Sequence, residues 1–292
     1  IATVLFSLGG LVIAGLQAHQ HFLLPALAPS LYDIGSLIGI LILAPAAGYQ
    51  IGPVTLPAFD LGVYGLVYGV IIGAGLFLLV QIPGLIRFRF RWTPKLNIQD
   101  PGVQKVLRLM APRVLTVFFI QLVFITQDNL ASRLATGSVT ALVYGWLFMQ
   151  VPESLIGTSL GTALLPTLSE QIARGDREAF QRTLGKTIRV ILSLTIPSAL
   201  LLAFNIDPLL RVLDFDAAGQ ELVFHTVQAF LAGLIGHSLL EVAARTFYAQ
   251  KNARTPLLAS GITFLVFLIA GLFLAPRLGA PGIGLANSAA FT

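Results

Sequence analysis

The chain has 292 residues, of which 56% are hydrophobic and only 11% are charged, and its mean hydropathy is +0.85. Because a soluble domain has about 25% charged residues, this composition excludes a soluble globular protein and predicts a protein that crosses a membrane many times. The absence of cysteine excludes disulfides, thiol chemistry and thiolate metal sites.

Long apolar segments follow one another along the whole chain. A transmembrane helix needs about 20 mostly apolar residues, and eight such segments and the start of a ninth are present. They are 2–18, 26–46, 61–85, 107–131, 139–163, 187–206, 222–245, 256–276 and 282–292. The chain begins and ends inside apolar runs, so we expect a fragment truncated at both ends. The predicted fold class is an all-α polytopic membrane protein.

The basic residues divide unequally between the two sides of the membrane. Of the 18 Lys and Arg residues, 15 lie in or beside one set of loops and three lie on the opposite side. The positive-inside rule therefore predicts that loops 86–106, 164–186 and 246–255 are cytoplasmic and that loop 207–221 faces outward. The net charge of +5 follows from this asymmetry, and we expect no nucleic-acid partner.

The segment 86–106 is basic and contains Trp92 and several Phe residues. It is interpreted either as an amphipathic linker along the anionic inner leaflet or as a solvated positive loop. Contact with membrane lipids is expected in the first case.

Two short patterns recur in the same order. Ala18-x6-Pro25-x2-Ala28 parallels Ala249-x6-Pro256-x2-Ala259, and the motif at 61–65, LGxxG, recurs at 278–282. The copies lie six predicted helices apart and share one orientation, which indicates two lobes related by an axis along the membrane normal. The predicted organisation is the end of a first lobe at 1–85, the linker 86–106 and a second lobe at 107–292.

The most informative polar residues lie within the segment 139–163. Gln150 and Glu153 are spaced i,i+3 on one helix face, with Pro152 between them. An ionised carboxylate at bilayer depth costs roughly 2.5–3.5 kcal/mol on insertion scales unless it faces a partner or water. Because Pro152 removes a helix hydrogen bond, the segment is typical of a kinked helix beside a transport cavity or gate. The alternative is a buried Glu that serves packing alone.

Two further polar groups lie in the segment 107–131. Gln121 and Asp128 are seven residues apart on one face, which suits either a cavity wall or an interfacial helix end. Arg113 follows Pro112 near the cytoplasmic end of this segment. It either extends toward the interface or faces an anion such as a phosphate.

His237, Glu241 and Arg245 step by four along one helix face. Glu241 and Arg245 are in the favourable order for an i,i+4 ion pair, and they are candidates for a gate. His237 is either a proton site or a satisfied buried histidine. The glycines at 65, 69 and 73, and those at 157 and 161, predict close helix packing.

No arrangement of residues typical of an enzyme is present. The sequence has no nucleophile elbow, phosphate loop or HExxH motif. Four scattered histidines predict no metal centre. We therefore expect a transporter and not an enzyme, with no catalytic residues and no bound cofactor.

Four stretches together resemble the MurJ/MviN family of lipid II flippases, in the multidrug/oligosaccharidyl-lipid/polysaccharide (MOP) exporter superfamily. The most specific is LLPTLS at 164–169 followed by GDxxxF at 175–180. The others are HFLLPALAPSLYDIGSLIG, DPGVQKVLRLMAPRVL and LLEVAARTFYAQKNARTP, in family order. The resemblance covers nearly the whole chain, as about helices 4 to 12 of a two-lobe fold.

This resemblance implies alternating-access export of lipid II, an undecaprenyl-pyrophosphate glycolipid, across the bacterial inner membrane for cell wall biosynthesis. It also suggests the cell-wall synthesis machinery as a partner. The chain departs from the family pattern at three positions, where an acidic residue, an arginine and a glutamate are replaced by Trp146, Leu147 and Gln150.

The departures leave other functions open. One is a related exporter of another polyprenyl-linked polysaccharide or of a cationic drug. Another is a membrane scaffold that does not transport.

Overall fold

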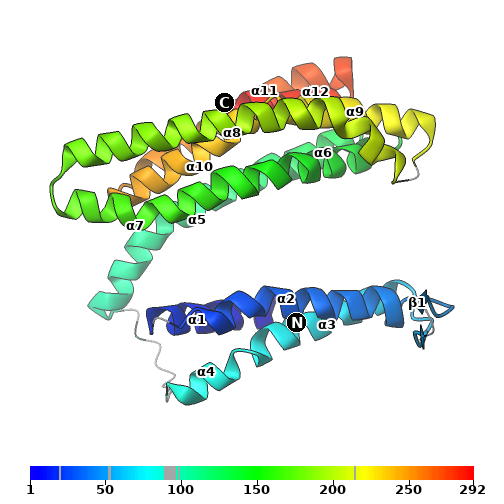
Figure 1. Cartoon of the computed structure of the whole chain (residues 1–292), viewed down its shortest axis with the longest axis horizontal. Helices are drawn as coiled ribbons and strands as arrows, with labels where there is room; N and C mark the ends of the chain where they lie inside the picture. The colour runs from blue at the N-terminus through cyan, green and yellow to red at the C-terminus, as the bar shows by residue number, and fades with distance from the viewer. Residues whose placement is uncertain (20, 52–53, 89–96, 98, 214) are drawn as a thin grey trace. The chain divides into compact units, whose positions relative to one another are not determined.

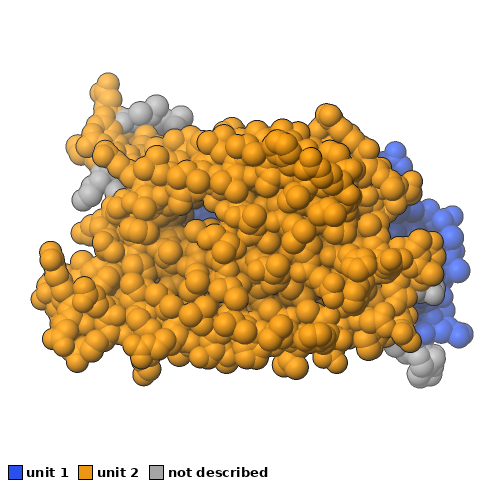
Figure 2. Space-filling model, turned by 90° about the horizontal axis from the view of Figure 1, so that it is seen from above, with its two compact units in different colours: residues 1–96 blue, residues 97–292 orange. Residues whose placement is uncertain are grey.

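The computed structural model describes residues 1–292 apart from residues 20, 52–53, 89–96, 98 and 214 (Figure 1). The chain divides into two compact units, Ile1–Leu96 and Asn97–Thr292, which Figure 2 shows in two colours. The expected lobe boundaries at 85 and 107 stay a prediction. Residues 89–96 and 98 of the expected amphipathic segment 86–106 lie outside the described residues.

Unit 1 is a group of apolar helices. It contains α1 (Ala2–Ala18), α2 (Leu23–Ile38), the π-helical turn η1 (Gly39–Leu43), α3 (Val63–Leu79) and α4 (Ile82–Arg87). Between η1 and α3, the two-residue strands β1 (Gln50–Ile51) and β2 (Val54–Thr55) pair antiparallel, with Gln50 opposite Thr55. Hydropathy does not reveal this small hairpin, because it lies in the connection between two spans.

Glycines hold α2 against α3. A Cβ atom on Gly35 would lie 2.2 Å from the Cα atom of Gly73, and one on Gly69 would lie 2.5 Å from the Cα atom of Gly39. Such distances exist only between residues without side chains, so the two backbones touch. Membrane helices lack a hydrophobic driving force toward one another and gain from this close approach. The predicted role of the glycine strip in α3 is confirmed.

Unit 2 contains longer helices. They are α5 (Pro101–Ala131), α6 (Ser138–Glu153), the π-helical turn η2 (Ser154–Thr158), α7 (Ser159–Ala173), α8 (Arg177–Arg211), α9 (Ala217–Leu231), α10 (Leu234–Ala249), α11 (Arg254–Leu278) and α12 (Ala280–Phe291). Three aspartates cap helix starts by accepting backbone N–H groups: Asp100 at α5, Asp176 at α8 and Asp216 at α9.

Each of the nine predicted apolar segments corresponds to a helix or helix pair in the described part of the chain. Six spans are long and apolar enough to cross a membrane, and α9 with α10, bent by 42°, forms a seventh. The expected bounds of loops 164–186 and 207–221 are wrong, because α7, α8 and α9 extend into them and leave short turns. The side of the membrane that each loop faces stays a prediction. A helix can continue through charged residues outside the bilayer, whereas hydropathy detects only the apolar part of that helix.

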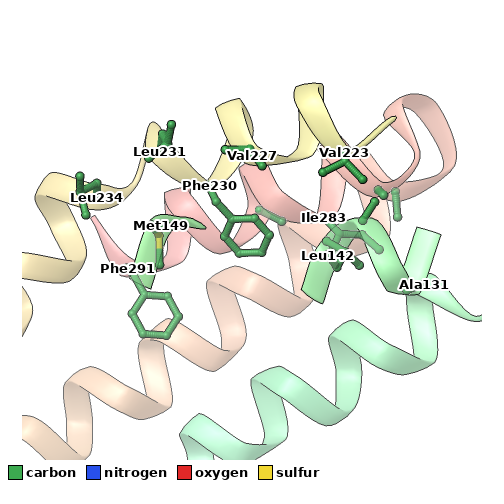
Figure 3. Close-up of a cluster of buried hydrophobic side chains, with 14 of the residues drawn as sticks. Ala131, Leu142, Met149, Val223, Val227, Phe230, Leu231, Leu234, Ile283 and Phe291 are labelled. Atoms are coloured by element: carbon green, nitrogen blue, oxygen red, sulfur yellow. The ribbon is translucent and has the colours of Figure 1, made fainter. Parts of the chain in front are cut away.

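The main core of unit 2 lies between α5, α6, α9, α11 and α12 (Figure 3). On α6 the buried side chains include Leu142 and Met149, seven residues apart, and Gly145 between them lies against the Phe230 ring. This spacing is one stripe of an α-helix. It determines which face of α6 turns away from the core.

The repeat detected in the sequence is a structural repeat. Pro25 is the third residue of α2 and Pro256 is the third residue of α11, and both are buried. The helices that follow, α3 and α12, are preceded by Gly62 (φ 50°, ψ −129°) and Gly279 (φ 66°, ψ −142°). Only glycine adopts such a conformation readily. The local helix–turn pattern therefore recurs at both places, and the relation of the two lobes by an axis along the membrane normal stays a prediction.

Candidate functional site

A cavity of about 450 Å³ lies inside unit 2, and four charged residues line it. Its walls come from α5, α6, η2, α10, α11 and α12. Five residues singled out from the sequence line it together: Arg113, Glu153, His237, Glu241 and Arg245. Helical spacing explains part of the convergence, because His237, Glu241 and Arg245 are spaced by four and share one face of α10.

Glu153 reaches the cavity at the point where α6 becomes a π-helical turn. Its side chain is half-buried, and its Oε1 atom accepts a hydrogen bond of 3.2 Å from the Thr158 hydroxyl. A π turn places residues i and i+5 above one another, which makes this contact possible. Pro152 is buried and lies two residues before the turn begins at Ser154. The irregularity predicted from the sequence is therefore a change of hydrogen-bond pattern without a break in the helix.

Glu241 and Arg245 form the ion pair that their spacing predicts. The Arg245 Nε and Nη2 atoms donate to Glu241 Oε1 at 3.1 and 2.6 Å, and the two side chains are only 27% and 30% exposed. Gly161 of α7 lies beside both: a Cβ there would be 3.4 Å from Arg245 Cγ. The small residue lets α7 approach the pair, so the carboxylate and guanidinium are held at the cavity wall.

Arg113 lies on α5, on the same stripe as the cavity-lining Thr116 and Ile120. Its guanidinium carbon is 5.9 Å from the centre of the Tyr248 ring, which is a cation–π distance. Within the described residues it has no carboxylate partner within ion-pair distance. The cavity therefore contains one paired and one unpaired arginine.

His237 is buried and contacts side chains of α12 and α6. It is 8% exposed, its Nε2 atom is 3.0 Å from the Asn287 Oδ1 atom, and its ring stacks on Phe291 at 4.1 Å. Trp146 meets the same ring edge-on. This arrangement favours the satisfied buried histidine over the proton site.

The other predicted cavity residues lie elsewhere on their helices. Gln121, Asp128 and Gln150 are exposed and do not line this cavity, and their role in transport stays a prediction. Gln150 is about 100° around the helix from the buried Met149, whereas Glu153 is only about 40° away. In the described part of the chain, no group of three His, Cys, Asp or Glu side chains is placed to hold a metal ion.

Two residues were missed from the sequence. Thr158 was missed because its contact with Glu153 depends on the π turn. Asp33, in the second half of α2, is an exposed carboxylate. The sequence signal that could have identified Asp33 is a single charged residue within an apolar run.

The Glu241–Arg245 pair allows a stability prediction with a matched control. We expect R245A to destabilise the full-length protein and E241Q to restore part of the loss, because E241Q removes the unpaired carboxylate. The coupling energy in the double-mutant cycle should be about 1 kcal/mol, since contacting residues couple by roughly 0.5–3 kcal/mol. The measurement is thermal or chemical unfolding of the purified protein.

Arg174 and Glu170 serve as the control, because they have the same i,i+4 spacing but are 73% and 60% exposed. Their coupling should be below about 0.5 kcal/mol. Equal coupling in the two pairs would show that the cavity does not strengthen the Glu241–Arg245 contact.

The spans, the repeat and the charged cavity define a class, a multi-pass α-helical membrane protein with a transporter fold. A solved MurJ lipid II flippase in an inward closed conformation shares this fold, with a TM-score of 0.75 and 23% identity over 99% of this chain and 58% of that chain. A MOP-superfamily transporter from Pyrococcus furiosus has a TM-score of 0.58 and 17% identity over 64% of this chain and 41% of that chain.

The sequence comparisons are more specific. The family model described as "Lipid II flippase MurJ" matches residues 2–292. The lipid II flippase MurJ of Burkholderia cenocepacia is 32% identical over 290 residues, 97% of this chain and 54% of that protein. This chain belongs to the lipid II flippase MurJ family. It spans about half the length of the curated relatives it matches.

Proposed function

We propose that the full-length protein is a transporter of the bacterial inner membrane that moves lipid II, the undecaprenyl-linked peptidoglycan precursor, across the bilayer by alternating access. The observation that carries the proposal is the charged cavity of about 450 Å³ within membrane-spanning helices of a chain that belongs to this family. Buried ionisable groups in a membrane are costly and mark substrate or ion pathways.

The cavity chemistry suits a lipid with a charged and hydroxyl-rich headgroup. Arg113 offers a cation that no carboxylate neutralises within the described residues, and Glu153 offers an acceptor for hydroxyl or amide donors. Arginine binds phosphate oxygens through several N–H groups. We propose that Arg113 is the anion contact of this unit, in the lobe where Leu147 stands in place of the arginine expected from the family.

The irregular helix beside the cavity supports the proposal that this wall of the cavity moves during transport. Pro152 and the π turn Ser154–Thr158 interrupt the regular hydrogen bonding of the α6–α7 span next to Glu153. Interruptions of this kind are frequent at functional sites. We propose that this turn bends as the cavity opens to one side of the membrane and then to the other. Contact with cell-wall synthesis enzymes is a further part of the proposal.

A depletion–rescue experiment tests the function. The full-length gene should restore growth and cell shape to a bacterium depleted of its own lipid II flippase, and purified protein in vesicles should move fluorescent lipid II between leaflets. A protein that reaches the membrane at normal levels but does neither would contradict the proposal. Resistance to cationic drugs, gained instead of rescue, would indicate a drug exporter.

A further inference from the structure

The span built from α9 and α10 is broken at its centre. The 15 residues of α9 end at Leu231, the 16 residues of α10 begin at Leu234, and the two helices are bent by 42°. Figure 3 labels the residues on either side of the break. A break at bilayer depth leaves backbone groups without their regular hydrogen-bond partners, and lipid offers no substitute. Another part of the protein must therefore supply such partners.

The rearranged hydrogen bond at the break concerns the carbonyl group of Ala229. In a regular α-helix the N–H group of Gly233 would donate to the Ala229 carbonyl oxygen, four residues earlier. Here it donates to the Phe230 carbonyl oxygen at 3.0 Å. The Ser288 hydroxyl of α12 donates to the Ala229 carbonyl oxygen at 2.5 Å and lies 3.3 Å from that of Phe230. A side chain of another helix thus replaces the backbone donor that the bend removes.

This contact is buried inside unit 2. Ser288 is 5% exposed, and a Cβ atom on Gly233 would lie 2.6 Å from the Ser288 Cα atom. The preceding residue, Asn287, is fully buried, and its Oδ1 atom is 3.0 Å from the Nε2 atom of His237 in the first turn of α10. Two consecutive residues of α12 therefore contact both sides of the break, and neither contact lies at the surface of the unit.

The bend sets the direction of the cavity-lining face of α10. Glu241 and Arg245 line the cavity, and they follow Gly233 by about 12 and 18 Å along the helix axis. A tilt of α10 by about 10° would displace Arg245 by about 3 Å. Because a hydrogen bond tolerates only a few tenths of an ångström, such a tilt would remove this side chain from contact with a bound group.

We propose that Ser288 is a positioning residue for transport: its hydroxyl holds the bend between α9 and α10 and thereby keeps the Glu241–Arg245 pair directed into the cavity. Without that hydroxyl, the Ala229 carbonyl recovers a donor from its own helix only if the Gly233 N–H returns to it, which straightens the span. The part of this inference that concerns transport rests on the proposed flippase function, whereas the role of Ser288 in the bend does not.

Spin-label distances test the bend. In a cysteine-free version of the full-length protein, one label is placed on Gln250, the exposed residue that follows α10, and the second on Glu178 of α8 or on Leu265 of α11, both exposed. Since α10 is about 24 Å long, a tilt of about 10° moves its end by about 4 Å. At least one mean distance should therefore change by about 2–4 Å in S288A and S288V, and both should stay at the wild-type values in S288T.

The variants separate the hydroxyl from the volume of the side chain. S288A adds no volume, and S288T and S288V have the same shape but differ in the hydroxyl group. T195V is the matched control, because the buried Thr195 hydroxyl of α8 donates to Ile191 of its own helix at 2.7 Å, so its removal should leave the distances unchanged. Wild-type distances in S288A, or the same distances in S288T as in S288V, would overturn the role of Ser288 in the bend.

The rescue assay relates the bend to transport. If wild type rescues a flippase-depleted strain, S288A should slow lipid II movement in vesicles by about tenfold, the factor that corresponds to one lost hydrogen bond, and S288T should move lipid II at the wild-type rate. If wild type does not rescue, the flippase proposal fails, and the spin-label distances still decide on Ser288. Changed distances in S288A with wild-type transport would overturn the positioning role.

Discussion

Replacing Glu153 by alanine in the full-length protein should abolish rescue of a flippase-depleted strain. Glu153 brings a carboxylate into the cavity at the π turn, where Thr158 donates to it. A charged hydrogen bond is worth about 1.5–3 kcal/mol, so losing one substrate contact of this kind should slow transport by roughly tenfold to hundredfold. The measurements are growth after depletion and the initial rate of lipid II movement in vesicles.

Two variants separate charge from shape at this position. E153Q keeps the volume and an oxygen that accepts from Thr158, so its transport should fall nearly as far as that of E153A if the charge is what acts. V143A is the matched control, because Val143 lies on the same helix but is exposed and does not line the cavity. Normal growth of E153A at wild-type protein level would remove Glu153 from the mechanism.

Replacing Gly35 by valine should strongly destabilise unit 1. A Cβ atom at this position would lie 2.2 Å from the Cα and 2.3 Å from the N atom of Gly73. Both are backbone atoms, so no side-chain rotation relieves the clash and α2 must separate from α3. Overpacking of a tight interface costs about 1–3 kcal/mol or more, and we expect the upper end of this range. The melting temperature should then fall by about 6–12 °C.

Gly75 of α3 provides the control for helix propensity. A Cβ atom there meets nothing within 4 Å, so G75V introduces the same side chain without a clash. Its melting temperature in detergent, followed by size-exclusion chromatography after heating, should stay close to that of wild type. If G35V were as stable as G75V, the close contact between α2 and α3 would not hold unit 1 together.

The candidate site was partly accessible from the sequence. His237, Glu241 and Arg245 share a face because they are spaced by four, and the ion pair follows from the order of its charges. Glu153 attracted attention as a carboxylate in an apolar helix. Helix periodicity says which residues share a face, but it does not say which face meets a neighbour. For that reason Gln121 and Gln150 were grouped with Glu153, although neither lines the cavity.

The helix ends show a similar limit. Apolar runs located the spans, but they missed the extension of α7 to Ala173 and the start of α8 at Arg177. Hydropathy reports the part of a helix that lies in lipid, and charged residues continue a helix into water without any apolar signal. The π turns at Gly39–Leu43 and Ser154–Thr158 were also invisible, because hydrogen-bond pattern depends on packing more than on local composition.

Composition and local patterns were sufficient to identify a polytopic membrane protein with a repeated helix–turn pattern, and the orientation that its basic residues predict stays a prediction. These properties follow from transfer free energies and from turns that need Pro or Gly, which are local in the chain. The tertiary structure was needed to show that Arg113, Glu153 and the Glu241–Arg245 pair share one cavity. This arrangement depends on contacts between helices that are distant in the sequence, and the close packing of side chains determines which of those contacts form.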